Sequence, residues 1–329
     1  MLLTQHDAIL SDLDGVVYAG PHAIPGAPEA LNKAQSLGVP VAFVTNNASR
    51  SVQAVADHLV ELGVKTDADH VISSAQAAAE LLAEQLSPGS RVLVTGAQAL
   101  ADCVRAVGLV PVASQADEPV AVVQGFNPKI LWEDLAEAAY TLADEKVLWV
   151  ASNTDFTIPK ERGIAPGNGT LVGAVATATG RTPLVAGKPE SPIFVTAAQK
   201  LGASSPVVVG DRLDTDIQGG NRAGMATAVV MTGVETFESI LAAIPLERPT
   251  YLLTDLSGFF ETYPEISCEA TTSGFTASGA GWTATAQGSE LTISGQGKDV
   301  DSWRVACAAW WAAHPDIAEP TLPERIQRG

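Results

Sequence analysis

AILSDLDGVVY, residues 8–18, is an apolar run that ends in two carboxylates and a glycine. The run is long enough for a buried strand, and open α/β sheets place their chemistry at the carboxyl ends of such strands. Asp12 and Asp14 repel each other unless a cation lies between them or one is protonated. The residues alone leave two interpretations: a catalytic pair with bound Mg²⁺, or a surface turn of the Asp-x-Asp-Gly kind.

Two further segments end strand runs in groups that suit a phosphate. Thr45 and Asn46 end the run 40–46, and backbone N–H groups at such a place can bind phosphoryl oxygens. Lys188 ends the run 184–188, and an ammonium group serves a phosphate as a point charge. Each segment also has a plainer interpretation, because residues such as Thr and Asn routinely cap helices and most single lysines are solvated.

A fourth strand run, residues 206–210, leads to Asp211, and Asp216 follows five residues later. Mg²⁺ takes oxygen ligands and keeps several waters, so a few carboxylates are enough to bind it. The alternative is that Asp214 caps a helix while Asp216 supplies a charge in its first turn. Four strand runs that end in Asp-x-Asp, Thr, Lys and Asp, in that order, form a combination that chance rarely supplies.

In this combination the sequence resembles the haloacid dehalogenase superfamily of phosphotransferases, with all four signature segments between residues 8 and 220. The segments DLDGVVY, TNNAS and GKP are similar to the branch that contains 4-nitrophenyl, pyridoxal-phosphate and phosphoglycolate phosphatases. The resemblance implies an enzyme that hydrolyses a small phosphorylated metabolite, with glycerol 3-phosphate or phosphoglycolate favoured. Two alternatives stay open: a phosphomutase with the same aspartates, and a non-catalytic sensor of phosphorylated metabolites.

The resemblance implies a role for each of the acids. Asp12 matches the nucleophile that becomes an aspartyl phosphate, and Asp14 matches the general acid and base. The Asp12 and Asp211 carboxylates and the Asp14 carbonyl match the ligands of Mg²⁺, the implied cofactor. Asp216 matches a second acid near the metal. This assignment agrees with the physics, because phosphoryl transfer depends on positioning and on neutralisation of charge.

The resemblance also assigns the groups that hold the substrate. Thr45, the Asn46 backbone and Lys188 match the residues that bind the phosphoryl oxygens. Asn153, Arg162 and the glycine-rich residues 167–173 match the region of the substrate-specificity loop. Arg162 could clamp a substrate hydroxyl or carboxylate, and a plain surface arginine is the alternative.

Composition is typical of a cytoplasmic metabolic enzyme. The chain has 329 residues, of which 46% are hydrophobic and 17% charged, so it can bury a large core and should divide into domains. Its formal net charge of -18 argues against nucleic acid or an anionic membrane as a partner. The first signature begins within a dozen residues of Met1, which leaves no room for a signal peptide, and no apolar run approaches membrane-spanning length.

Strand runs that alternate with helical patterns predict an α/β fold with a doubly wound parallel sheet. We expect residues 1–75 and 185–262 to form the core domain and residues 76–184 to form an inserted α/β cap. By resemblance, this cap covers the active site, and its closure would exclude water and select the leaving group. Because caps in this branch often pair two subunits, the resemblance allows a homodimer through the cap.

The tail, residues 265–329, departs from the family pattern. It contains four of the six tryptophans of the chain, namely Trp282, Trp303, Trp310 and Trp311. Gly, Ser and Thr abound over 271–297, and a helical pattern follows over 300–313. We expect a small α+β extension of hairpins and a helix, docked through its tryptophans and without catalysis. Such tails occur on actinobacterial glycerol-3-phosphate phosphatases, where they look like an incomplete acetyltransferase fold.

Overall fold

The computed structural model describes residues 1–48, 50–160 and 162–329, which divide into two compact units. The first unit combines Met1–Val41 with Ala203–Gly329, and the second is Ala42–Gly202. Both units contain parallel strands that alternate with helices. The predicted α/β class with a small C-terminal α+β extension is confirmed.

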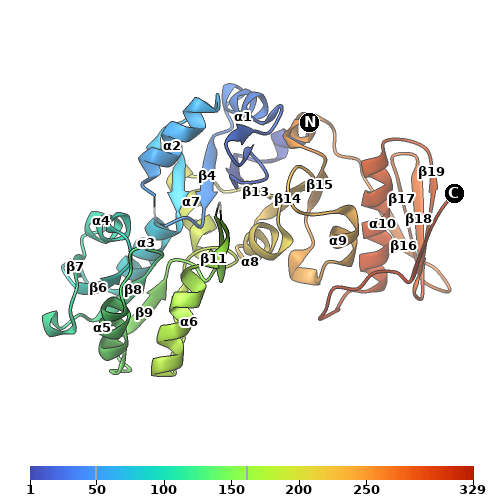
Figure 1. The fold of residues 1–329 in the computed structure, drawn as a ribbon. Helices are drawn as coiled ribbons and strands as arrows, with labels where there is room; N and C mark the ends of the chain where they lie inside the picture. The colour runs from blue at the N-terminus through green and yellow to red at the C-terminus, as the bar shows by residue number, and fades with distance from the viewer. Residues whose placement is uncertain (49, 161) are drawn as a thin grey trace. The chain divides into compact units, whose positions relative to one another are not determined.

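Four parallel strands form the centre of the first unit (Figure 1). In spatial order they are β15 (Tyr251–Leu253), β14 (Ala226–Val230), β13 (Pro206–Gly210) and β1 (Ala8–Ser11). Every residue of β1 and β13 is buried, as expected for continuous apolar strands of a sheet covered on both faces. This part also contains β2 (Tyr18–Ala19), β3 (His22–Ala23), α1 (Ala27–Ser36), α8 (Gln218–Arg222) and α9 (Phe237–Ala242).

The C-terminal extension is a five-stranded sheet covered by one long helix (Figure 1). Its strands, in spatial order, are β16 (Ser267–Ala270), β17 (Phe275–Gly279), β18 (Trp282–Gln287), β19 (Glu290–Gly295) and β20 (Arg325–Arg328). The first four are antiparallel neighbours, and β20 runs parallel to β19. The helix α10 (Asp299–Ala313) packs on the small and aliphatic side chains of this sheet. The predicted hairpins and the helix over 300–313 are therefore confirmed.

The second unit contains two sets of parallel strands. β4 (Val41–Thr45) pairs with β5 (Val71–Ser73). A separate sheet has the order β12 (Leu184–Val185), β9 (Leu148–Ala151), β8 (Ala121–Gln124), β6 (Arg91–Thr95) and β7 (Val110–Val112). β10 (Thr157–Lys160) pairs with β11 (Gly163–Pro166). The helices are α2 (Val52–Glu61), α3 (Ser74–Gln85), α4 (Gln98–Ala106), α5 (Trp132–Leu142), α6 (Asn168–Thr179) and α7 (Pro192–Leu201).

Helix α6 begins inside residues 167–173, where we expected a loop. A Cβ on Gly167 would lie 2.2 Å from the Asp155 carbonyl oxygen, and one on Gly169 would lie 2.1 Å from the Thr154 carbonyl oxygen. The first turn of α6 thus packs directly on the backbone of residues 154–155. These glycines serve a close backbone approach, so the loop interpretation of residues 168–173 is wrong.

Among the described residues, no helix combines the length and the apolar character that crossing a bilayer needs.

Candidate active site

Three of the predicted acids form a cluster in the first unit. Asp12 directly follows β1, Asp211 directly follows β13, and Asp216 lies in the π-helical turn Leu213–Ile217. One carboxylate oxygen of each lies within 4.8 Å of the other two. Because β1 and β13 are parallel neighbours, their carboxyl ends lie at the same edge of the sheet, and residues far apart in the sequence meet there.

The cluster fits a magnesium ion by the chemistry of its donors. Asp211 and Asp216 are 2% and 1% exposed, and Asp12 is half-buried. Three carboxylates at this separation repel one another unless a cation neutralises them. Carboxylate oxygens are the ligands Mg²⁺ prefers, and a site with few protein ligands leaves positions for water and phosphate oxygens.

Two glycines make room for these carboxylates. A Cβ on Gly210 would lie 2.1 Å from the Asp216 Cβ, and one on Gly15 would lie 2.2 Å from the Asp211 Oδ2. Gly15 also has a φ of 78°, a conformation that glycine adopts at little steric cost. Sequence reasoning noted Gly15 as a turn residue and missed its second role, which is to let the Asp211 carboxylate approach the backbone.

Asp14 is exposed and lies outside the three-carboxylate cluster. The turn that carries it is closed by backbone hydrogen bonds, from the Gly15 N–H to the Tyr18 carbonyl at 2.9 Å and from the Val17 N–H to the Leu13 carbonyl at 2.8 Å. A solvent-accessible carboxyl group on a fixed turn suits proton exchange with a substrate and with water.

Asp214 forms an ion pair instead of a helix cap. The Arg212 guanidinium donates to both carboxylate oxygens of Asp214, at 3.0 and 2.9 Å. This hydrogen bonding raises the pKa of Arg212 above its usual value. Asp216, which the alternative interpretation placed in the first turn of a helix, is buried in the cluster with Asp12. The helix-cap interpretation of Asp214 is therefore wrong.

The predicted phosphate-binding residues lie in the second unit, and two of them are joined directly. Asn46 follows β4, whose last residue is Thr45. The Asn46 Nδ2 donates to the Lys188 carbonyl at 3.1 Å, and its Oδ1 accepts from the Lys188 N–H at 2.8 Å. The Thr45 Oγ1 accepts from the Asn47 N–H at 3.1 Å. A Cβ on Gly187 would lie 2.6 Å from the Asn46 Oδ1, so this glycine permits the contact.

Asn153 belongs to the same group of contacts. Its Nδ2 donates to the Asn46 carbonyl at 2.8 Å, and its own carbonyl accepts from the Asn168 Nδ2 at 2.7 Å. Asn153 is 4% exposed, whereas Arg162 is exposed. The Asn46 Nδ2 also lies 3.2 Å from each carboxylate oxygen of Asp155. Sequence reasoning gave Asp155 no role, although its position two residues after Asn153 was an available signal.

Comparisons with known proteins identify the family of this chain. A haloacid dehalogenase-like hydrolase model matches residues 9–110, and a HAD-hydrolase-like model matches residues 185–259. A D-glycerol 3-phosphate phosphatase from Mycobacterium tuberculosis is 43% identical and covers 99% of this chain and 91% of its own length. An acid sugar phosphatase from Staphylococcus aureus is 37% identical and covers 78% of this chain and 97% of its own length.

A solved structure extends the comparison to three dimensions. The crystal structure of a glycerol phosphate phosphatase from M. tuberculosis in complex with magnesium is 41% identical, with a TM-score of 0.87, and covers 100% of this chain and 95% of its own. Its complex with calcium gives a TM-score of 0.89 at the same identity, with 100% of this chain and 94% of its own covered. The chain belongs to the haloacid dehalogenase-like hydrolases, as the resemblance implied. Within that family it is a phosphatase, and its three-carboxylate cluster offers oxygen ligands of the kind that Mg²⁺ prefers.

Proposed function

We propose that this protein hydrolyses glycerol 3-phosphate through an aspartyl phosphate formed on Asp12. The observation that carries the proposal is the cluster of Asp12 with the buried Asp211 and Asp216. Support for this substrate over phosphoglycolate comes from the mycobacterial relative, which is named for glycerol 3-phosphate and covers 99% of this chain.

In the first half of the reaction, an oxygen of Asp12 bonds to phosphorus while the bond from phosphorus to the glycerol oxygen breaks. Asp14 donates a proton to that leaving oxygen. Asp14, now a carboxylate, then takes a proton from water as the water oxygen bonds to phosphorus, and the bond from phosphorus to Asp12 breaks, which releases inorganic phosphate and restores the Asp12 carboxylate. Mg²⁺ supplies the neutralisation that lets an anionic carboxylate approach an anionic phosphate.

Thr45, the Asn46 backbone and Lys188 would hold the phosphoryl oxygens during both halves of the reaction. A local cation is needed because the formal net charge of the chain is -18 and the substrate is also an anion. The Lys188 ammonium and the metal are the local charges that would outweigh this global field.

Residues 76–184 would act as the cap that selects the leaving group, with Asn153 and Arg162 as the candidate specificity residues. We further propose that this cap pairs two subunits, which light scattering on the purified protein tests directly. A cytoplasmic location is consistent with a phosphorylated metabolite as substrate and with three free cysteines.

The primary experiment is phosphate release from a panel of small phosphomonoesters, with Mg²⁺ and with a chelator. We expect metal-dependent turnover that is highest for glycerol 3-phosphate. Asp12→Asn should lose at least about a thousandfold in kcat while keeping its circular dichroism spectrum, because no nucleophile remains. Undiminished activity in that variant would contradict the mechanism.

Other outcomes of the same panel separate the alternatives. Turnover that requires an added bisphosphate would indicate a phosphomutase. Binding of metal and substrate without release of phosphate would indicate a sensor. Turnover that is equally slow for all substrates would overturn the choice of glycerol 3-phosphate.

A further inference from the structure

The segment Thr232–Glu235 packs against the three-carboxylate cluster and makes hydrogen bonds to Asp211 and to the turn beside the cluster. The Val234 N–H donates to the Asp211 Oδ2 at 3.0 Å. The Thr232 Oγ1 donates to the Gly15 carbonyl at 2.6 Å. This hydrogen bond fixes the turn between β1 and β2. The segment therefore orients one metal-binding carboxylate directly and supports the turn that follows another.

Glu235 extends this support to the turn that carries Asp216. Its Oε1 accepts from the Leu213 N–H at 3.1 Å, at the first residue of that turn. Its Oε2 accepts from the Ser239 Oγ at 2.5 Å, so both oxygens of the side chain are fixed. Glu235 thus connects the turn to helix α9, in which Ser239 lies.

Gly233 shows how closely the segment and the cluster approach. A Cβ at this position would lie 2.0 Å from the Asp211 Oδ2 and 2.4 Å from the Asp211 Cβ. The backbone at Gly233 therefore lies directly against the Asp211 side chain, with no room for a larger residue.

Helix α9, which follows this segment, is held by the C-terminal extension. The Phe237 ring stacks on the Trp303 ring, with centroids 5.1 Å apart and planes at 8°. The Trp311 Nε1 donates to the Leu241 carbonyl at 3.1 Å. The extension therefore contacts both ends of α9.

One apolar cluster joins the turn Leu213–Ile217, which carries Asp216, to the C-terminal extension. Leu213 and Ile217, at the two ends of the turn, belong to one cluster of buried residues with Trp303 and Trp310 of α10. The family models end at residue 259, before the extension. The extension is therefore a segment that those models do not contain, and in this chain it supports the metal site of the family.

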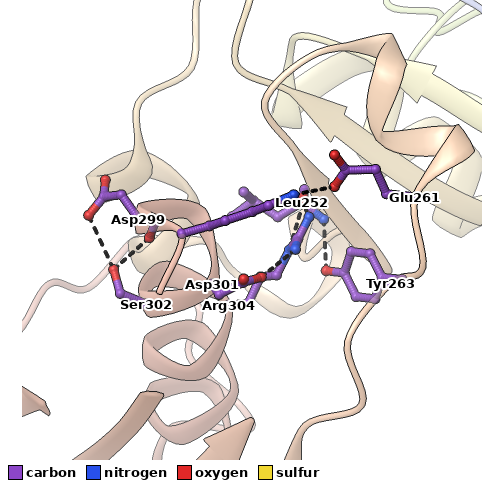
Figure 2. A network of polar contacts seen from close by, with 8 residues as sticks. Leu252, Glu261, Tyr263, Asp299, Asp301, Ser302 and Arg304 are labelled. Carbon is purple, nitrogen blue, oxygen red and sulfur yellow. Dashed lines mark hydrogen bonds and ion pairs between the residues drawn. The ribbon is translucent and has the colours of Figure 1, made fainter. Parts of the chain in front are cut away.

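Polar contacts fix α10 against the strand next to this cluster (Figure 2). The Arg304 guanidinium donates twice to the Leu252 carbonyl, at 3.0 and 2.6 Å, and forms an ion pair with Asp301. It also lies 4.3 Å from the centre of the Tyr263 ring. Arg304 and Asp301 are about nine-tenths buried, so this junction is well protected from solvent.

We propose that the C-terminal extension positions the metal-binding residues. Helix α10 fixes α9 through the Phe237–Trp303 stack, α9 fixes Thr232–Glu235, and that segment fixes Asp211 and the turn of Asp216. A pre-positioned set of carboxylates binds a metal more tightly, because supporting contacts limit its reorganisation. The proposal rests on the proposed function only for the location of the metal site.

The test is calorimetric titration of the full-length protein with Mg²⁺ alone. Glu235→Gln should weaken binding about tenfold, as supporting residues of metal ligands commonly do. Trp303→Ala should weaken it about three- to tenfold, which lies within the range for coupling through packed residues. Trp303→Phe keeps an aromatic ring at the stack and should restore the affinity to within about twofold.

Leu291→Ala is the matched control, because Leu291 is fully buried in the sheet of the extension and belongs to the same apolar cluster. It should lower the melting temperature without changing the Mg²⁺ affinity. If Trp303→Ala does not fold, Phe237→Leu removes the same stack from the side of α9. Melting curves without metal confirm that each variant is folded before titration.

Three outcomes would overturn the proposal. An unchanged Mg²⁺ affinity in folded Trp303→Ala or Phe237→Leu shows that the extension is not coupled to the metal. Equal weakening by Leu291→Ala shows a general loss of stability. Asp211→Asn tests the location of the metal site separately from its coupling to the extension. This variant must abolish Mg²⁺ binding. If it does not, the metal site is misplaced and the proposed function falls with it.

Discussion

The side-chain amide of Asn46 makes two hydrogen bonds with the backbone of Lys188, one in each direction. The amide nitrogen donates to the Lys188 carbonyl, and the amide oxygen accepts from the Lys188 N–H. A side chain here does what a neighbouring strand does in a sheet. The loop that carries the buried lysine is thereby fixed to the end of β4.

Asn46→Asp tests this arrangement because it keeps the shape and removes the donor. A carboxylate oxygen would then face the Lys188 carbonyl and the Asp155 carboxylate. We expect the free energy of unfolding to fall by about 1–3 kcal/mol, and kcat/KM to fall about tenfold or more. Urea unfolding and steady-state kinetics measure the two quantities. Asn46→Ala removes the bonds without adding a charge and should be the milder variant; the opposite order would contradict this account.

Alanine substitutions at Gly15 and Gly20 form a matched pair that tests the crowding at the three-carboxylate cluster. Both have positive φ, 78° and 58°, but a Cβ would meet Asp211 only at Gly15, since nothing lies within 4 Å of one at Gly20. Alanine at either position should cost about 1–2 kcal/mol of stability because of the left-handed backbone. Only Gly15→Ala should also lose activity, about a hundredfold, since small misplacements of catalytic groups have effects of that size. Equal kcat values in the two variants would contradict the prediction.

The Arg304–Asp301 pair should matter more for stability than an exposed pair of the same extension. Arg304→Met leaves a buried Asp301 carboxylate without its counter-ion and should cost about 3–5 kcal/mol. Lys298→Met breaks the ion pair between Lys298 and Glu261, whose side chains are 62% and 56% exposed, respectively. This change should lower the free energy of unfolding by at most about 1 kcal/mol. Chemical unfolding of both variants measures the difference. Adding Asp301→Asn to Arg304→Met should recover part of the loss.

His6 should make the stability of the protein depend on pH. Burial lowers the pKa of His6 below its usual value of 6.5. Between that lowered pKa and pH 6.5 the unfolded chain binds more protons than the folded one, so the free energy of unfolding falls as the pH falls through this window. His6→Asn should flatten this part of the curve. Urea unfolding at a series of pH values tests it, and parallel curves for the two proteins would refute the prediction.

The meeting of Asp12 and Asp211 could be predicted because each directly follows a strand whose sequence is unambiguous. The β-branched run before Asp211 and the apolar run before Asp12 are fully buried strands, and the ends of parallel strands are where polar residues gather. The same reasoning selected Thr45, the last residue of β4, and Lys188, which lies three residues after β12; their role in phosphate binding stays a prediction. Local sequence carried the predictions for Asp12 and Asp211 because the signal lies within each strand and the residue that follows it.

The residues that support the site could not be predicted in this way. Thr232 and Val234 act through a backbone carbonyl and a backbone N–H, and such contacts leave no mark in the pattern of polar and apolar residues. Gly167 and Gly169 appeared to signal a loop, because a glycine required for close packing looks the same in sequence as one required for a turn. Tertiary contact decided these cases.

The tryptophans of the extension have a practical consequence. Trp303 and Trp310 are buried in the cluster that reaches the acid-bearing turn, whereas Trp132 in the second unit is 72% exposed. Indole emission shifts to longer wavelength when water reaches the ring, so a loosening of α10 would be detected as a red shift of the tryptophan fluorescence of the unlabelled enzyme. Fluorescence can therefore report the movement of α10 in the same cuvette in which turnover is measured.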